Sequence, residues 1–252
     1  MVAPVSGSVV SELVLADAES LQDLGRYAAR ARALDADGAV RLQAVGPVLA
    51  SWVCVLPGSG LMGTGTTLGL RTSALDVPAE LDVVVPLAAV SDRVARPGER
   101  AVLPVPPMTV SVAWAAVSPP RSGWQVVGSV GSEALQRVAS EGIAEVADGT
   151  PDGAGSAAVA ALRERVWGRV VPLASSTADP VADVAGVAGD LARTNGDRVG
   201  GDEGADSPAY PAALAFAAYA LGFLTLGGES TLSTNGRWTR LTTPAGHALT
   251  RR

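Results

Sequence analysis

The sequence holds one histidine and one cysteine, and each stands apart from the partners that would make it catalytic. His247 is the one side chain that could act as a general base near neutral pH with its ordinary pKa. No G-x-S-x-G nucleophile elbow supplies it with a serine. Cys54 lies between Val53 and Val55, which is typical of a small buried side chain rather than a reactive thiolate. We therefore expect catalysis from neither residue.

The basic residues of the sequence are all arginine, since the 19 positive side chains include no lysine. A Schiff-base nucleophile and a Walker-type phosphate loop both need a lysine, so these enzyme classes are excluded. A zinc site would need further ligands near Cys54 or His247, and the turn Asp35-Ala-Asp37-Gly38 lacks the acid that closes a calcium loop, because Gly46 stands there. We expect no cofactor, no metal and no enzymatic activity. The Arg, Ala, Val and Gly bias indicates a GC-rich bacterial genome.

A glycine motif at Gly58–Gly63 matches the G-x-G-x-x-G spacing of dinucleotide-binding loops and follows an apolar segment. A true site needs a helix that begins in the loop, so that backbone amides meet the pyrophosphate. Here residues 64–70 are rich in Thr and Gly and favour a strand. The motif is therefore interpreted as a strand-to-strand loop. A small-ligand or anion-binding role for Gly58–Gly63 or for Arg121 stays open as an alternative.

Two tryptophans flank a short loop that carries one arginine. Trp114 and Trp124 stand on either side of Ser118–Gly123, and Arg121 is the only charged residue of that loop. Trp and Arg dominate binding hot spots, and a guanidinium can anchor a carboxylate or a phosphate. In the structural interpretation, both indoles fill the core and Arg121 lies on a rigid turn. Trp114, Arg121 and Trp124 are the candidate ligand or partner contacts.

Four arginines near the C-terminus form a second candidate set. Arg237, Arg240, Arg251 and Arg252 lie on or beside an expected β-hairpin, and residues 207–252 hold four Arg against one acid. This pattern has the shape of a DNA-binding wing. The segment before the hairpin is rich in Ala, Leu, Phe and Tyr, however, and carries no base-reading side chains. The net charge of −6 also disfavours nonspecific nucleic-acid binding, although it does not exclude a small basic face. Nucleic-acid binding is therefore an alternative only.

Hydrophobic periodicity predicts the elements that position these residues. Helices are expected at 17–34, 132–148 and 156–168, with a further apolar helix in 208–228. Strands are expected at 39–45, 48–55, 66–72, 81–85, 109–117 and 124–130, followed by a hairpin formed by 236–243 and 247–252. Long helices do not alternate with these strands, so the sequence predicts an α+β fold: a mostly antiparallel or mixed sheet of about six strands packed with helices, plus a C-terminal helix and β-hairpin.

The domain organisation is read from shifts in composition. We expect a sheet-based core over 1–150, a packing helix within 151–173, an acidic mobile loop over 174–207, and the C-terminal helix and hairpin over 208–252 packed on the core. Residues 208–228 carry no charge, but their prolines and abundant alanine favour a buried helix over a membrane span. A single cysteine and the lack of a leader-like start predict a cytoplasmic protein.

These observations favour a cytoplasmic, non-enzymatic protein-interaction or scaffold protein, whose partner is another protein or a second copy of the chain. Two alternatives remain. One is a nucleic-acid accessory role through Arg237, Arg240, Arg251 and Arg252, and the other is small-ligand or anion binding.

Overall fold

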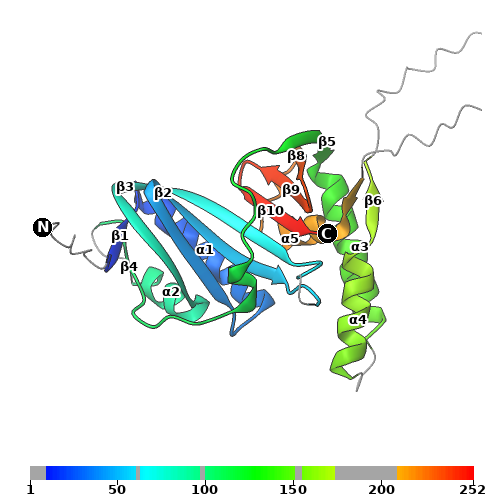
Figure 1. Ribbon diagram of the computed structural model, residues 1–252, viewed down its shortest axis with the longest axis horizontal. Helices are drawn as coiled ribbons and strands as arrows, with labels where there is room; N and C mark the ends of the chain where they lie inside the picture. The colour runs from blue at the N-terminus through cyan, green and yellow to red at the C-terminus, as the bar shows by residue number, and fades with distance from the viewer. Residues whose placement is uncertain (1–9, 61–62, 97–99, 151–154, 174–208) are drawn as a thin grey trace, which may run out of the picture.

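A six-stranded antiparallel sheet forms the centre of the protein in a computed structural model, which describes residues 10–60, 63–96, 100–150, 155–173 and 209–252 (Figure 1). The predicted α+β class is confirmed, since helices pack on this sheet and its strands pair antiparallel. In sheet order the strands are β2 (Ala39–Leu56), β3 (Thr67–Pro86), β10 (Gly246–Arg251), β9 (Trp238–Thr243), β8 (Glu229–Asn235) and β5 (Gln125–Gly131).

The other described elements are two short strand pairs and the helices. The pairs are β1 (Glu12–Val14) with β4 (Val102–Pro104), and β6 (Val170–Pro172) with β7 (Ala209–Pro211). The helices are α1 (Ala18–Leu34), α2 (Leu87–Val94), the short 3₁₀ helix η1 (Ala113–Ala116), α3 (Ser132–Asp148), α4 (Ser156–Trp167) and α5 (Ala212–Ala220).

Helix α1 begins and ends where the sequence predicts. The side chain of Asp17 accepts a hydrogen bond from the backbone N–H of Ser20 at 2.7 Å, so it caps the first turn. Leu21, Leu24 and Ala28 lie on the buried side of α1 and contact the sheet core. The predictions for α3 and α4 are likewise confirmed to within a residue.

Strands β2 and β3 form one long hairpin, which corrects four shorter predicted strands. The sequence predicted a break at Gly46-Pro47, but β2 continues through it with a β-bulge between Gly46 and Val48. Strand β2 lies at the edge of the sheet, so Pro47 can sit in it without removing a hydrogen bond from an inner ladder. Likewise, 66–72 and 81–85 belong to the single strand β3. The predicted turn is therefore a bulge, which adds an unpaired residue to β2 without ending the strand.

Three further predictions need correction. Residues 109–117 contain η1 instead of a strand, because this apolar stretch covers the sheet instead of joining it. Strand β8 was not predicted, since its sequence Glu-Ser-Thr-Leu-Ser-Thr-Asn has little apolar alternation. The helix expected in 208–228 is only the nine residues of α5. No helix among the described residues is long and apolar enough to cross a membrane.

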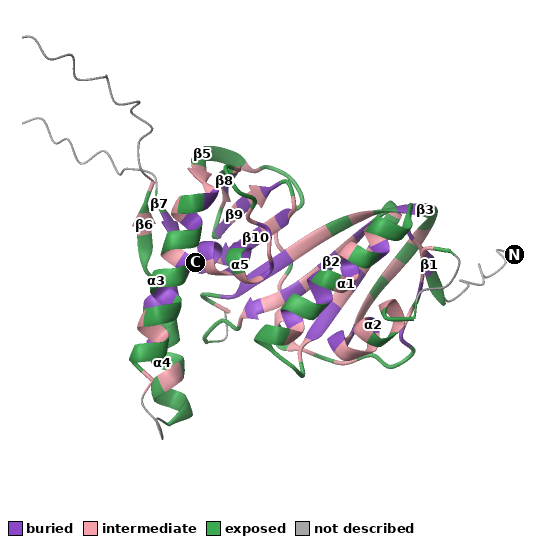
Figure 2. Ribbon diagram, turned by 180° about the vertical axis from the view of Figure 1, so that it is seen from behind, coloured by how far each residue is buried: buried purple, intermediate pink, exposed green. Residues whose placement is uncertain are grey.

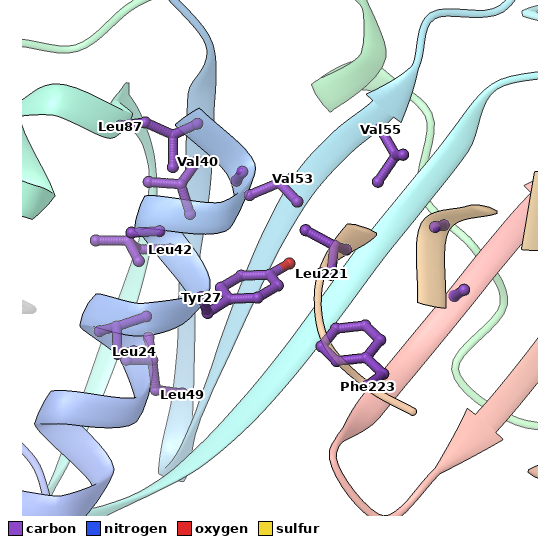
Figure 3. Packing of buried hydrophobic residues seen from close by; sticks show 14 of the residues in the cluster. Leu24, Tyr27, Val40, Leu42, Leu49, Val53, Val55, Leu87, Leu221 and Phe223 are labelled. Atoms are coloured by element: carbon purple, nitrogen blue, oxygen red, sulfur yellow. The ribbon is translucent and has the colours of Figure 1, made fainter. Parts of the chain in front are cut away.

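The main core lies between the sheet and helices α1 and α5, as Figure 3 shows for part of its buried side chains. The buried ring of Tyr27 stacks on Phe223, with ring centres 5.9 Å apart. The Tyr27 hydroxyl donates to the backbone oxygen of Ser51 at 3.2 Å. The side chains of α5 are buried on almost all sides of the helix (Figure 2), because α5 packs on the centre of the sheet and also contacts α3 and α4.

The sheet pairs a strand from the N-terminal half of the chain with the C-terminal strand. Residues Thr67–Leu70 of β3 pair with His247–Thr250 of β10, so the C-terminal hairpin lies inside the main sheet. Arg71 adds side-chain links at the same junction, because it pairs with Asp23 of α1 and donates to the backbone oxygen of Ala245. The predicted division at residues 150 and 208 stays a prediction, and the expected acidic loop at 174–207 lies outside the described residues.

Candidate functional site

Four of the five tryptophans lie on the face of the sheet away from α1 and α5, which we call the outer face. Leu68, Trp238 and Leu249 form its buried centre. Trp52, Trp114 and Trp124 pack against that centre and stay half-buried, together with Cys54, Leu70 and Val117. Cross-strand pairs place these sheet residues on one face, since Trp52 is opposite Leu70 and Cys54 is opposite Leu68. This face therefore presents indole surface to its surroundings.

A chain segment crosses the outer face and completes a cavity there. In Figure 1 the green segment between β4 and β5 passes in front of the sheet, whereas α1 lies behind it. The cavity between this segment and the sheet measures about 240 Å³, and we call it the outer cavity. Its lining comes from the sheet (Arg41, Gln43, Trp52, Leu68 and Asp82) and from the crossing segment (Trp114, Ala115, Val117, Ser118, Pro119 and Arg121).

An arginine–carboxylate pair forms the polar floor of the outer cavity. Arg41 donates to Asp82 twice, from Nε to Oδ1 at 2.7 Å and from Nη2 to Oδ2 at 2.6 Å. Its Nη1 atom donates to the backbone oxygen of Ala115 at 3.0 Å and to the hydroxyl of Ser118 at 3.2 Å. Arg41 therefore fastens the crossing segment to the sheet. Gln43 also donates to Asp82, at 3.1 Å.

The charges around Asp82 keep its carboxyl ionised. Hydrogen bonds and the charge of Arg41 lower the pKa of Asp82 from its usual value, and Gln43 and the charge of Arg121 add to this. The same pairing raises the pKa of Arg41. Because Arg41 neutralises Asp82, the cavity is left with the charge of Arg121.

Arg121 lies exposed at the rim of the outer cavity, on a loop that is fixed on both sides. The indole N–H of Trp124 donates to the oxygen of Pro120 at 3.0 Å, and the amide of Asn235 donates to the oxygen of Ser122 at 2.7 Å. Gly123 follows with a φ of +79°, which favours glycine. Among the described residues Arg121 itself forms no ion pair and no hydrogen bond. The backbone that carries Arg121 is therefore fixed, and its exposed guanidinium is available to a ligand.

The structure brings two of the three predicted contact residues to the same cavity. Trp114 and Arg121 line it, whereas Trp124 lies beside it and is covered by Arg240, whose guanidinium carbon is 4.3 Å from the centre of the indole. Trp124 thus supports the loop instead of lining the cavity. Spacing along the sequence located Trp114 and Arg121, but Arg41, Asp82 and Trp52 were missed, because no local pattern connects them with the crossing segment.

The four C-terminal arginines do not form one uniform surface. Arg237 and Arg252 are exposed and adjacent, since the backbone N–H of Arg252 donates to the oxygen of Arg237 at 2.8 Å. Arg240 is half-buried and lies over the ring of Trp124, and burial lowers its pKa. Arg251 is half-buried and its backbone pairs with Thr66. Only Arg237 and Arg252 are therefore fully presented for contact with a polyanion.

The remaining candidates from the sequence are Cys54, His247 and the Gly58–Gly63 motif. Burial raises the pKa of the Cys54 thiol to about 12, as does the charge of Asp35 to a lesser extent, so the thiolate is disfavoured. Burial and then the charge of Arg240 lower the pKa of His247. In the Gly58–Gly63 motif the backbones of Ser59 and Thr64 exchange two hydrogen bonds, and residues 61 and 62 lie outside the described residues. Within the described ranges no three metal-ligating side chains gather.

The fold resembles that of a protein assigned as a bacterial DNA polymerase III beta subunit. A crystal structure of a protein assigned as this subunit from Eubacterium rectale aligns with a TM-score of 0.55 and 7% identity over 95% of this chain and 64% of that one. The beta subunit from Pseudomonas aeruginosa aligns with a TM-score of 0.47 and 14% identity over 95% and 64%, and the sliding clamp from Bacillus subtilis with 0.42 and 12% over 100% and 66%. The chain thus spans 64% of the length of the first two structures.

Two family profiles cover nearly all of the chain. The chain belongs to the family described as Domain of unknown function (DUF8185), whose profile matches residues 119–252. A second profile, Domain of unknown function (DUF8010), matches residues 9–115. No curated protein matches the chain significantly. The outer cavity lies at the junction of the two matched segments, because the first ends at Ala115 and the second begins at Pro119, and both residues line the cavity.

Proposed function

We propose that this protein is a non-enzymatic protein-interaction scaffold and that the outer cavity is its contact site for a protein partner. The observation that carries the proposal is the pairing of half-buried Trp114 with the unneutralised Arg121 around one cavity. Trp and Arg are the residues most enriched at binding hot spots. The fold shared with a protein assigned as a DNA polymerase III beta subunit supports a scaffold role, and the single cysteine favours action in the cytoplasm.

The size and chemistry of the outer cavity support a partner over a substrate. Sites for drug-sized ligands measure roughly 300–1,000 Å³, and this cavity of about 240 Å³ is smaller. The side chains of Arg41 and Asp82, which are two of its ionisable groups, are hydrogen-bonded to each other. A general base needs a lone pair that can take a proton near neutral pH, and the lowered pKa of Asp82 removes it from that role.

The test is affinity purification of tagged protein from its native lysate with nuclease present, followed by quantitative mass spectrometry. We expect a stoichiometric protein partner that is retained by the wild type and lost by Trp114→Ala. Arg165→Gln is the matched control, because Arg165 is exposed on α4 away from the outer cavity. The same set of proteins on wild type and Trp114→Ala would contradict the proposal. Turnover of a metabolite that Trp114→Ala abolishes would replace it with an enzymatic role.

Nucleic-acid binding is a second candidate function. The adjacency of the exposed residues Arg237 and Arg252 favours it, as does the fold shared with a protein assigned as a DNA polymerase subunit. This role predicts binding to duplex DNA that weakens as salt rises and that Arg237→Gln with Arg252→Gln abolishes. Binding that is absent at low salt, or that the double variant retains, would exclude this candidate.

A further inference from the structure

The outer cavity combines one available cation with apolar walls, and this combination limits what it can bind. The indoles of Trp52 and Trp114 and the side chains of Leu68 and Val117 supply apolar surface. Arg41 and Asp82 neutralise each other, as described above. Arg121 therefore leaves the lining with an excess positive charge, and a complementary occupant carries one negative charge beside an apolar group.

The loop that carries Arg121 is preorganised in the free protein. Hydrogen bonds to Pro120 and Ser122 hold the backbone on each side of Arg121. Asn235 reaches this loop from β8, so the sheet itself supports the position of Arg121. A guanidinium binds carboxylates and phosphates through two parallel hydrogen bonds. Because the loop is already ordered in the free protein, binding loses little conformational entropy there, and this favours affinity.

The size of the outer cavity selects between the possible anions. About 240 Å³ accommodates a single amino-acid residue and not a folded surface. A C-terminal residue of an apolar type joins an apolar side chain to a free carboxylate, whereas a phosphate lacks the apolar group. Resting on the proposed function, we propose that the outer cavity binds the C-terminal residue of a partner protein, with an apolar or aromatic side chain against Trp52 and Trp114 and the α-carboxylate on Arg121.

The experiment uses the full chain labelled with ¹⁵N and follows the indole N–H signals of its tryptophans. The probe is an acetylated peptide ending in Phe with a free carboxylate, compared with the same peptide amidated and with phenylacetate. We expect the acid peptide to shift the signals of Trp52 and Trp114 and to bind about tenfold more tightly than the amide, because the hydrogen bond to a charged group is lost. Arg121→Gln should remove this difference, and Arg165→Gln should keep it.

The results also separate this inference from the proposed function. Equal binding of acid and amide, or shifts confined to Trp167 and other distant signals, overturns the inference. Phenylacetate that binds as tightly as the peptide overturns the peptide source and favours a small carboxylate. If a partner is lost in Trp114→Ala yet retained in Arg121→Gln, the scaffold role stands and recognition of a carboxylate fails.

Discussion

The guanidinium of Arg240 lies 4.3 Å from the centre of the Trp124 indole. This contact joins the two sets of residues that the sequence presented as separate candidates, one for partner binding and one for nucleic acid. Arg240 is half-buried on β9, and its Nε atom has no hydrogen-bond partner among the described residues. The contact fixes Trp124, whose own N–H holds Pro120 and so the loop of Arg121.

Replacing Arg240 should therefore destabilise the fold and loosen the rim of the outer cavity. We expect Arg240→Gln to lower the free energy of unfolding by about 1 kcal/mol, the usual size of a half-buried cation–π contact. Urea unfolding followed by Trp fluorescence measures the change. Arg237→Gln is the matched control, since Arg237 is exposed on the same hairpin. Equal stability of the two variants would show that the contact with Trp124 adds nothing.

The single histidine allows a direct test of the electrostatics near Arg240. Burial and the charge of Arg240 lower the pKa of His247 below its ordinary 6.5. The unfolded chain therefore binds a proton more readily, and His247 reduces stability as the pH falls below about 6.5. In Arg240→Gln the repulsion is gone, so we expect the pKa of His247 to rise.

An NMR titration of the His247 Cε1 proton gives this pKa without overlap, because the chain holds no other histidine. Arg237→Gln should leave the midpoint unchanged. A wild-type midpoint at or above 6.5 would be incompatible with the burial of His247.

The Arg41–Asp82 pair should make stability fall in acid. The pKa of Asp82 is lowered in the folded protein, so its contribution is complete above the unfolded pKa and disappears as the pH falls through the folded one. We expect wild type to lose more stability than Asp82→Asn between about pH 5 and about pH 2. The side chain of Asp82 is 45% exposed, so solvent screening keeps this difference small. Parallel urea titrations at both pH values would reveal identical losses if the pair were unimportant.

Gly69 permits the closest approach between β3 and the segment after α5. A Cβ atom at Gly69 would lie 2.1 Å from a methyl carbon of Leu221 and 3.1 Å from the Tyr27 hydroxyl oxygen. We expect Gly69→Ala to cost about 1–3 kcal/mol of stability through overpacking. Gly131→Ala is the control, because no atom lies within 4 Å of its added carbon. Thermal unfolding that ranks Gly131→Ala as equally destabilising would contradict this account of the packing.

Local signals in the sequence account for three of the helices and for part of the site. Asp17 and the apolar spacing after it determine α1 without help from distant residues, and α3 and α4 follow from the same periodicity. The spacing of Trp114, Arg121 and Trp124 around a proline-rich loop was likewise visible. Local patterns failed at β8, where polar Ser and Thr residues form an inner strand because both neighbouring strands supply its hydrogen bonds.

The sequence by itself determined the residue types available, and so the lack of lysine chemistry, as well as the boundaries of α1, α3 and α4 and the α+β class. The tertiary structure alone decided which residues meet. Arg41 and Asp82 are 41 positions apart and face each other only because β2 and β3 pair in one register. Arg240 reaches Trp124 only because β9 lies inside the sheet. Strand register and strand order depend on contacts between distant segments, and these contacts leave no periodic pattern along the chain.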